Sequence, residues 1–256
     1  MLVRSIVKRL VPAPVRRAGW QGYYSARNRW LQTVVSCQTT RKIAALTFDD
    51  GPNPAGTQPI VEVLARYQAR ATFFMLGRNV AAHPEIVRRV VQAGHALGNH
   101  TFTHRRLVGC SSMTVARELI QCQQAIREAV GAKPKLMRPP FGAQDATAFL
   151  TAWLLGYTVV NWAASGDDWN GDPASRVAER VLADIQHGGI ILLHDGWEPP
   201  AGQIKLGPEQ ERLQDRMPTL QALSSILEHL QGEGYEFVTV PEMLRVAPPL
   251  RRAWFV

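Results

Sequence analysis

Short apolar runs alternate with helical patterns along most of this 256-residue chain, and this alternation limits the folds that it can adopt. Seven runs have the length and the residue types of buried strands: Ile43–Phe48, Ala71–Met75, Ala96–Asn99, Leu136–Arg138, Tyr157–Trp162, Ile190–Leu193 and Tyr235–Val240. Between them lie segments with helical periodicity: Thr57–Gln68, Asn79–Ala93, Ser112–Val130, Gln144–Leu155, Pro173–Gln186 and Met217–Gln231. Strands that alternate with helices indicate a parallel sheet with crossover helices. We therefore predict an α/β fold, an irregular (β/α) barrel of about seven parallel strands, with a doubly wound open sheet as the alternative.

The positive charge of the chain is concentrated at its N-terminus. The formal net charge is +8, and residues 1–48 contain nine Lys or Arg residues and no acid. The rest of the chain contains 20 basic and 21 acidic residues, so it is close to neutral. A nucleic-acid-binding protein would carry basic residues along a groove, mixed with aromatic side chains. We therefore predict a basic helical arm over residues 1–40, a globular domain over residues 41–256 and no nucleic-acid partner.

The start of the arm has the pattern of a short amphipathic helix. Five apolar side chains share one face, with basic side chains opposite: Leu2, Val3, Ile6, Val7 and Leu10 against Arg4 and Lys8. We predict peripheral contact between residues 1–30 and an anionic membrane; the alternative is a helix that packs on the domain. No apolar run has the length of a signal-peptide core or a transmembrane helix, and three cysteines form no disulfide framework. These features predict a cytoplasmic protein, with the inner membrane as the surface contacted.

Polar residues follow five of the seven predicted strands. They are Asp49 and Asp50; His100 and His104; Arg138; Asp167, Asp168 and Trp169; and His194 and Asp195. In βα barrels the chemistry is carried out at the C-terminal ends of the strands. We therefore expect these side chains to converge on one rim.

Two neighbouring acids, Asp49 and Asp50, come directly after a fully apolar strand. Such a pair is costly to bury unless a cation or a shared proton compensates. His100 and His104, at positions i and i+4, can reach one ion, and two histidines with one carboxylate leave open positions as in catalytic metal sites. The alternatives are a simple Asp-Asp-Gly-Pro turn and a pair of surface histidines.

Three further groups have both a catalytic and a structural interpretation. Arg138 can orient a carboxylate base, or it can lock a turn through a salt bridge. His194 ends the most hydrophobic strand and suits general acid catalysis, or it is a core histidine with satisfied hydrogen bonds. Asp168 can raise the pKa of that histidine while Trp169 walls a pocket, or the two are a loop acid and a packing indole.

In this order, the motifs resemble those of the polysaccharide deacetylase family, also called the NodB-homology domain or carbohydrate esterase family 4. Five motifs over about residues 41–245 carry the resemblance: Thr47–Pro52 (TFDDGP), His100–His104 (HTFTH), Arg138–Phe141 (RPPF), Asp168-Trp169 (the second half of D-x-x-D-W) and Leu192–His194 (LLH). The family fold is an irregular (β/α) barrel, which agrees with the strand pattern. The resemblance makes residues 41–256 a catalytic domain.

The resemblance also implies a role for each matched residue. Asp49 would be the general base, held by Arg138, and Asp50, His100 and His104 would bind one divalent metal ion. His194 would be the general acid, tuned by Asp168. The backbone N–H of Phe141 would contribute to the oxyanion hole, and Phe141, Trp169 and Leu192 would line the acetyl pocket. Zinc is the metal implied, with cobalt, nickel, iron(II) or manganese as alternatives. The implied reaction releases acetate from the N-acetyl group of an amino-sugar glycan, whether polysaccharide, oligosaccharide or lipid-linked saccharide.

Two features depart from the family pattern or lie outside it. Ser165 stands where the family usually has the first Asp of D-x-x-D-W, and Asp167 is out of register with that position. The segment Trp197–Arg216 follows the His194 motif directly, so we expect it to shape the substrate groove. Two other functions are alternatives to the N-deacetylase: a deformylase or amidase acting on a lipid-linked sugar, and a catalytically idle glycan-binding barrel. The intact catalytic set favours an enzyme over the idle barrel.

Overall fold

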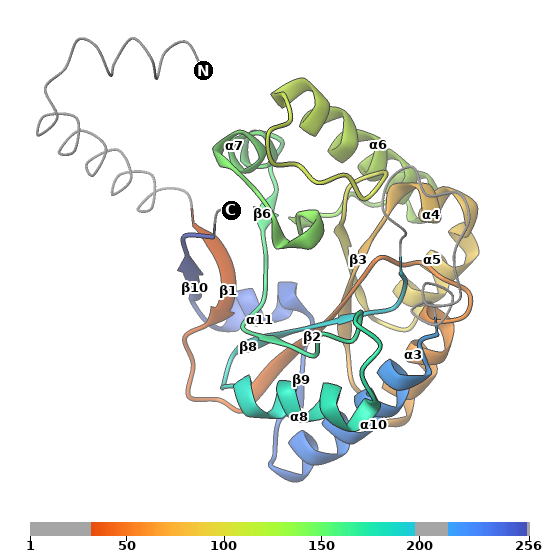
Figure 1. Ribbon diagram of the computed structural model, residues 1–256, viewed down its shortest axis with the longest axis vertical. Coiled ribbons are helices and arrows are strands. Elements are labelled where there is room, and N and C mark those ends of the chain that lie inside the picture. The colour runs from red at the N-terminus through yellow and green to blue at the C-terminus, as the bar shows by residue number, and fades with distance from the viewer. Residues whose placement is uncertain (1–31, 198–214, 255–256) are drawn as a thin grey trace, which may run out of the picture.

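The computed structural model describes residues 32–197 and 215–254, and its centre is a single curled sheet (Figure 1). The strands are β1 (Thr33–Cys37), β2 (Ile43–Asp49), β3 (Ala71–Met75), β4 (Ala96–Asn99), β5 (Leu136–Met137), β6 (Thr158–Val159), β7 (Ala164–Ser165), β8 (Gly189–His194), β9 (Glu236–Phe237) and β10 (Pro249–Arg252). Each of the seven apolar runs predicted to be strands overlaps one of these strands. The run Tyr235–Val240 keeps only two residues in a strand, because Thr239 begins a helix with a capping box.

The sheet has the order β10-β1-β8-β2-β3-β4-β5-β6, with β7 paired to β8 and β9 paired to β2. The pairs from β8 through β2 to β6 are parallel, whereas β1 is antiparallel to both β8 and β10. A bridge between Val34 in β1 and Val160 just after β6 brings the two sides of the curled sheet together. This arrangement confirms the predicted irregular (β/α) barrel.

The parallel register places the polar strand ends at one end of the barrel. Asp49, the last residue of β2, lies opposite His194 of β8 and Phe74 of β3. In the next pairs, Met75 lies opposite Asn99, which lies opposite Met137. Since His100 and Arg138 each follow these aligned residues directly, the predicted convergence of the strand ends is confirmed.

Helices cover the outside of the sheet. They are α3 (Thr57–Arg66), α4 (Gly77–Ala82), α5 (Pro84–Gln92), α6 (Ser112–Val130), α7 (Ala146–Leu154), α8 (Ala174–Asp184), α10 (Met217–Gly232) and α11 (Val240–Val246), with a 3₁₀ turn η1 (Pro140–Gly142). The single helix predicted over Asn79–Ala93 is wrong: two helices form, because Pro84 has no N–H to donate inside a helix and starts α5 instead.

The hydrophobic core lies between the sheet and this layer of helices. Every residue of β2 and β3 is buried, and Phe48 stacks on Phe73 with the ring centroids 5.1 Å apart. In Figure 1, α3, α8 and α10 lie along one side of the sheet and α4, α5 and α6 along another, while β1 and β10 form an edge. The strand ends that carry the polar residues are therefore held by a rigid, apolar scaffold.

The basic arm falls mostly outside the described part of the chain. The helix predicted for its first ten residues lies outside the described residues. Strand β1 lies within the range 1–40 assigned to the arm, and the structure joins it to the sheet. Among the helices of the described ranges, we find none with the length and apolar character needed to cross a bilayer.

Candidate active site

A pocket of about 350 Å³ opens at the C-terminal ends of the strands. Its lining combines acids, histidines and aromatic side chains: Asp49, Asp50, His100, His104, Phe141, Gly142, Trp162, Ser165, Asp167, Trp169, Leu192, His194 and Trp197. Eight of the ten residues predicted for the site are among them. The other two, Arg138 and Asp168, are buried behind the lining and contact Asp49 and His194 respectively.

The turn after β2 separates the two neighbouring acids. Asp50 adopts a positive φ of 75°, so the chain changes direction and the two carboxylates find different partners. Gly51 follows, and a Cβ there would lie 2.1 Å from Asp195 Oδ2, so glycine is required by close approach. The N–H of Gly51 donates to Asp195 Oδ1 at 3.0 Å, and the Thr57 hydroxyl donates to Asp195 Oδ2 at 2.5 Å.

Asp50, His100 and His104 form the metal-ligating group found among the described residues, with their ligand atoms within 4.8 Å of one another. Asp50 Oδ1 lies 3.4 Å from His100 Nε2 and 3.2 Å from His104 Nε2. The same oxygen is buried and has no hydrogen-bond partner. A buried carboxylate oxygen without a donor, facing two imidazole nitrogens, fits a divalent cation.

The backbone fixes the tautomer of one ligand. His100 Nδ1 lies 2.8 Å from the carbonyl oxygen of Arg138, so Nδ1 carries the proton and Nε2 presents its lone pair to the site. Burial lowers the pKa of His104 to about 4, so its imidazole is neutral at physiological pH. Burial raises the pKa of Asp50, but the charges of His104 and His100 lower it more, and it stays ionised. Burial lowers the pKa of His100, but the charges of Asp49 and Asp50 outweigh burial and raise it, so a metal ion bound there would displace the proton from Nε2.

Arg138 holds the other acid. This guanidinium is fully buried, and its Nη1 donates to Asp49 Oδ1 and to Thr47 Oγ1, both at 2.8 Å. Its Nη2 and Nε donate to the carbonyl oxygens of Asn161 and Val160 at 3.0 and 3.2 Å. The donors are therefore distributed around one carboxylate oxygen and three neutral acceptors, which leaves Asp49 Oδ2 on the side of the pocket, 3.7 Å from His100 Nε2.

His194 is oriented by Asp168. His194 Nδ1 lies 2.8 Å from Asp168 Oδ1, and the His194 backbone N–H donates to Oδ2 at 2.9 Å. The Thr219 hydroxyl of α10 also donates to Oδ2, at 2.8 Å. Burial lowers the pKa of His194, but the charge and the hydrogen bond of Asp168 outweigh burial and raise it to about 9. The imidazole is therefore protonated at neutral pH, with Nε2 turned away from Asp168.

Aromatic side chains wall the mouth of the pocket. Phe141 in η1 has a positive φ of 62° and an exposed ring whose centroid lies 4.6 Å from that of His104. Trp162 packs edge-on against Trp254 with centroids 5.1 Å apart. Trp169 is half exposed at the opposite strand end. A residue such as phenylalanine is uncommon at positive φ, and such strain concentrates at functional sites.

Ser165 and Asp167, the departure from the family motif, are connected to each other. The Ser165 hydroxyl donates to Asp167 Oδ1 at 2.7 Å, and the Asp167 N–H donates to Ser165 Oγ at 3.2 Å. Both residues line the pocket. The out-of-register acid therefore still places its carboxylate at the site.

Sequence reasoning missed two buried acids that contact the catalytic loops. Asp195 was noted at its strand end without a role, and it clamps the turn at Gly51. Glu118, in the middle of α6, was not predicted to have a role. It accepts hydrogen bonds from two backbone N–H groups of the His100–His104 loop. The position of Asp195 directly after His194, at the end of a strand, could have indicated a contact with the site. Glu118 carried no such indication, because it lies in an ordinary amphipathic helix.

Comparison with known proteins agrees with this geometry. The family model for Polysaccharide deacetylase matches residues 37–160. A chitooligosaccharide deacetylase of Bradyrhizobium sp. (strain ANU 289) is 38% identical over 77% of this chain and 89% of that protein. A peptidoglycan-N-acetylglucosamine deacetylase of Bacillus cereus is 36% identical over 80% of this chain and 89% of that protein. The structure of peptidoglycan deacetylase PdaC from Bacillus subtilis superposes with a TM-score of 0.69, at 30% identity over 81% of this chain and 92% of that one.

The irregular barrel and the Asp-His-His group define a metal-binding hydrolase. With relatives this similar over most of their length, the chain belongs to the polysaccharide deacetylase family. It is a deacetylase, a hydrolase acting on carbon–nitrogen bonds other than peptide bonds.

Proposed function

We propose that this deacetylase removes the acetyl group from N-acetylglucosamine residues of a glycan and releases acetate and a free amine. The observation that carries the proposal is the placement of a carboxylate, Asp49, and an imidazole, His194, at paired strand ends beside the Asp-His-His group. A base and an acid on either side of an amide suit hydrolysis, in which one takes a proton and the other gives one. The relatives named above act on chitooligosaccharides and peptidoglycan, which supports an N-acetylated glycan as substrate.

Asp50, His100 and His104 would hold one divalent ion. Zinc suits two imidazoles and one carboxylate, and cobalt, nickel, iron(II) or manganese can take the same ligands. When bound, such an ion polarises the amide carbonyl and lowers the pKa of a water molecule. His100 is kept in the required tautomer by the carbonyl oxygen of Arg138, which orients the ring as well as its proton.

Asp49 is proposed as the general base. Arg138 engages Oδ1, which leaves Oδ2 to accept the proton of the attacking water. As the tetrahedral intermediate forms, its negative charge needs donors that are already in place. We assign this role to the backbone N–H of Phe141. Phe141 lines the pocket, and its positive φ gives this turn an unusual backbone direction.

His194 is proposed as the general acid. Because Asp168 occupies Nδ1, the proton on Nε2 is the one available to the leaving amine. The raised pKa of about 9 keeps that proton in place at neutral pH. Trp169 and Leu192 line the same pocket and would surround the acetyl methyl group with apolar surface. A longer acyl chain would have to displace them.

The location of the substrate is the second part of the proposal. We propose that residues 1–30 contact an anionic membrane surface and that the enzyme acts at the cytoplasmic face on a lipid-linked or short saccharide. The support is the sequence pattern of the arm, with seven basic residues and no acid in residues 1–31. Cell fractionation tests it: replacing Arg4, Lys8 and Arg9 by Ala should move the protein from the membrane fraction, and an unchanged distribution would count against it.

Acetate release is the decisive test of the reaction. The metal-reconstituted enzyme should release acetate from N-acetylglucosamine oligomers or from lipid-linked N-acetyl sugars. Asp49→Asn and His194→Ala should each lose most of this activity, because each removes one proton-transfer group. Asp184→Asn and His229→Ala, which change residues of α8 and α10 that do not line the pocket, serve as matched controls. Formate release from N-formyl sugars at a higher rate than acetate release would favour the deformylase alternative instead.

A further inference from the structure

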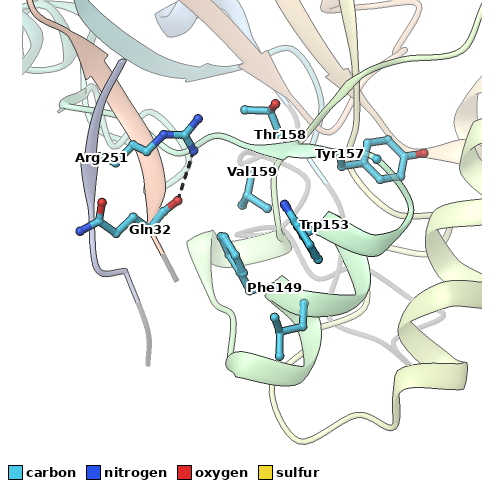
Figure 2. A pocket seen from close by; sticks show the side chains of 9 residues that line it. Gln32, Phe149, Trp153, Tyr157, Thr158, Val159 and Arg251 are labelled. Carbon is cyan, nitrogen blue, oxygen red and sulfur yellow. Dashed lines mark hydrogen bonds between the residues drawn. The ribbon is translucent and has the colours of Figure 1, made fainter. Parts of the chain in front are cut away.

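A second hollow lies away from the catalytic pocket, between α7 and the edge strands β1 and β10 (Figure 2). It has a volume of about 610 Å³ and shares no residue with the catalytic pocket. Phe149, Leu150 and Trp153 of α7 form one wall, and Arg251 of β10 with Gln32 forms the other. The Arg251 guanidinium donates to the carbonyl oxygen of Gln32 at 3.5 Å, so it faces the hollow from a fixed strand.

Helix α7 is apolar on both of its faces. Its inner face buries Ala148, Phe149 and Ala152 in a core cluster, as expected. Its outer face exposes Leu150, Trp153 and Leu154, which are 44%, 62% and 76% exposed. None of its nine residues is charged. A surface helix normally turns charged or polar residues to water, so a contiguous apolar face of this kind indicates a contact surface.

Positive charge surrounds this apolar face. Arg251 and its neighbour Arg252 are exposed on β10, and Lys135 is exposed beside the hollow, where its carbonyl oxygen accepts the N–H of Thr158. Gln32, in the wall of the hollow, is the residue at which the segment 1–31 joins the domain. In sequence, that segment contains seven Lys or Arg residues and no acid. An exposed tryptophan and leucines beside exposed basic residues match the two layers of an anionic membrane surface.

We propose that the outer face of α7, with the hollow beside it, docks on an anionic lipid surface. Trp153, Leu150 and Leu154 enter the boundary between head groups and acyl chains, and Arg251 and Arg252 meet the lipid phosphates. This contact belongs to the folded domain, so it adds to the proposed contact of residues 1–30 and does not depend on the catalytic roles. The alternatives are a second copy of the chain on the same face, and contact by the basic segment alone.

Vesicle binding by the full chain distinguishes these occupants. The variant Trp153→Ser with Leu154→Ser is compared with Met113→Ser, which removes a still more exposed apolar side chain from α6. On vesicles of phosphatidylglycerol and phosphatidylcholine, the double variant should bind at least about tenfold more weakly, since partitioning follows buried apolar area. Met113→Ser should bind like the wild type, and pure phosphatidylcholine should bind the wild type poorly. Acetate release from a short oligosaccharide should be unchanged in all variants.

Two results would overturn the proposal. One is a double variant that binds anionic vesicles as tightly as the wild type, which would leave the contact to the basic segment. The other is a wild-type dimer that becomes a monomer in the double variant with vesicle binding unchanged, which would assign the face to a second copy. Quenching of tryptophan fluorescence by brominated lipid provides a direct readout: the share that comes from Trp153 should disappear when Trp153 is replaced by Phe, while Trp20 and Trp30 of the basic segment keep theirs.

A separate observation concerns the loop that carries the two histidines. Thr101 and His104 have positive φ values of 72° and 60°, and for the β-branched Thr101 this backbone conformation is unfavourable. Such a backbone persists only where its surroundings hold it. Asn99 Oδ1 accepts the N–H of Thr101 at 2.9 Å and fixes the start of the loop. The N–H groups of Gly77 and Arg78 in α4 donate to the carbonyl oxygens of Thr101 and Phe102 at 2.9 and 3.1 Å, and side-chain contacts to the loop come from α6.

Glu118 is the residue of α6 that holds it. Its side chain is buried at 5% exposure. Oε2 accepts the N–H groups of Phe102 and Thr103 at 3.0 and 2.9 Å, and Oε1 accepts the Thr103 hydroxyl at 2.9 Å. All three donors lie between the two histidines. The carboxylate therefore fixes the separation and the orientation of His100 and His104 without contacting either.

We infer that Glu118 is a positioning residue for the metal ligands, an inference that rests on the proposed metal role of His100 and His104. Partners that orient metal ligands typically affect metal affinity by 10–100-fold. Glu118→Ala should therefore weaken Co²⁺ binding by about that factor and alter the Co²⁺ absorption bands. Glu118→Gln should restore most of the affinity, because its amide oxygen can accept both N–H groups and its amide NH₂ can donate to Thr103. Glu128→Ala, on an exposed turn of the same helix, is the matched control.

The outcomes separate this inference from the proposed function. If the wild type binds no Co²⁺, or if His104→Ala binds it as well as the wild type, the metal role itself is wrong. If the wild type binds Co²⁺ through His104 but folded Glu118→Ala binds it equally well, the positioning role is wrong. Should Glu118→Ala fail to fold, Thr103→Val takes its place. It removes one of the three hydrogen bonds and should weaken binding several-fold, whereas unchanged binding would overturn the inference.

Discussion

Replacing Arg138 by Met should destabilise the fold severely, because it leaves a buried negative charge without its cationic partner. Arg138 is fully buried, and its guanidinium lies over the Phe74 ring, 4.2 Å from the centroid. Methionine preserves much of this packing but donates no hydrogen bond. Asp49, 3% exposed, would then keep a carboxylate without its cation. Removing one partner of a buried ion pair costs about 3–5 kcal/mol, a large part of the 5–15 kcal/mol by which folded proteins are typically stable.

Urea denaturation in the presence of a chelator measures this cost without a contribution from bound metal. The control is Arg176→Met, which breaks an exposed pair with Glu179 at 2.9 Å and should cost less than about 1 kcal/mol. The double variant Arg138→Met with Asp49→Asn should recover part of the lost stability, because the unpaired Asp49 charge is no longer present. A loss of stability below about 1 kcal/mol for Arg138→Met alone would refute the reasoning. So would a double variant whose loss of stability exceeds the sum of the losses in the two single variants.

Three further predictions follow from the site. Asp168→Asn removes the charge that raises the pKa of His194 to about 9, so this pKa should fall. Since His194 is proposed to act in its protonated form, the alkaline limb of the kcat/KM profile should move to lower pH, and an unmoved limb would exclude it as the acid. Chelation should lower the melting temperature of the wild type, because an ion at 100 times its Kd stabilises by about 2.7 kcal/mol, whereas His104→Ala should show little chelator-dependent change. Gly51→Ala places a Cβ 2.1 Å from Asp195 Oδ2, so a calorimetric scan should show destabilisation by more than about 1 kcal/mol, and a neutral result would mean that the turn can relax.

The strands and the convergence of the polar strand ends were predictable because both depend on local patterns joined by one topological rule. A buried parallel strand is a continuous apolar run, and β2 and β8 are such runs. Once several strands are parallel, their C-terminal ends must meet at one end of the sheet. The residues after them, among them His100 and His194, were therefore expected to converge before any contact between them was known.

Contacts that join distant parts of the chain could not be predicted in this way. Nothing in the sequence around Glu118 indicates that its carboxylate caps a loop 15 residues earlier, because the contact exists only once α6 packs beside β4. The hydroxyl of Thr219 reaches Asp168 from a helix 51 residues further along. Strand β1 was not predicted for another reason: its place in the sheet depends on antiparallel pairing with β10 at the far end of the chain.

The two adjacent acids after β2 have different partners, and the difference in function that we propose for them can be measured directly. Asp49 is paired with a guanidinium, and Asp50 faces two imidazoles with a buried oxygen that has no donor. Asp49→Asn should therefore keep the metal, measured by elemental analysis after reconstitution, while acetate release falls by a factor of 10² or more for a lost general base. Asp50→Asn should lose most of the metal, and its activity should recover in part when the metal concentration is raised. If both variants lose metal equally, the two carboxylates share the ion, and the assignment of Asp49 as the base is wrong.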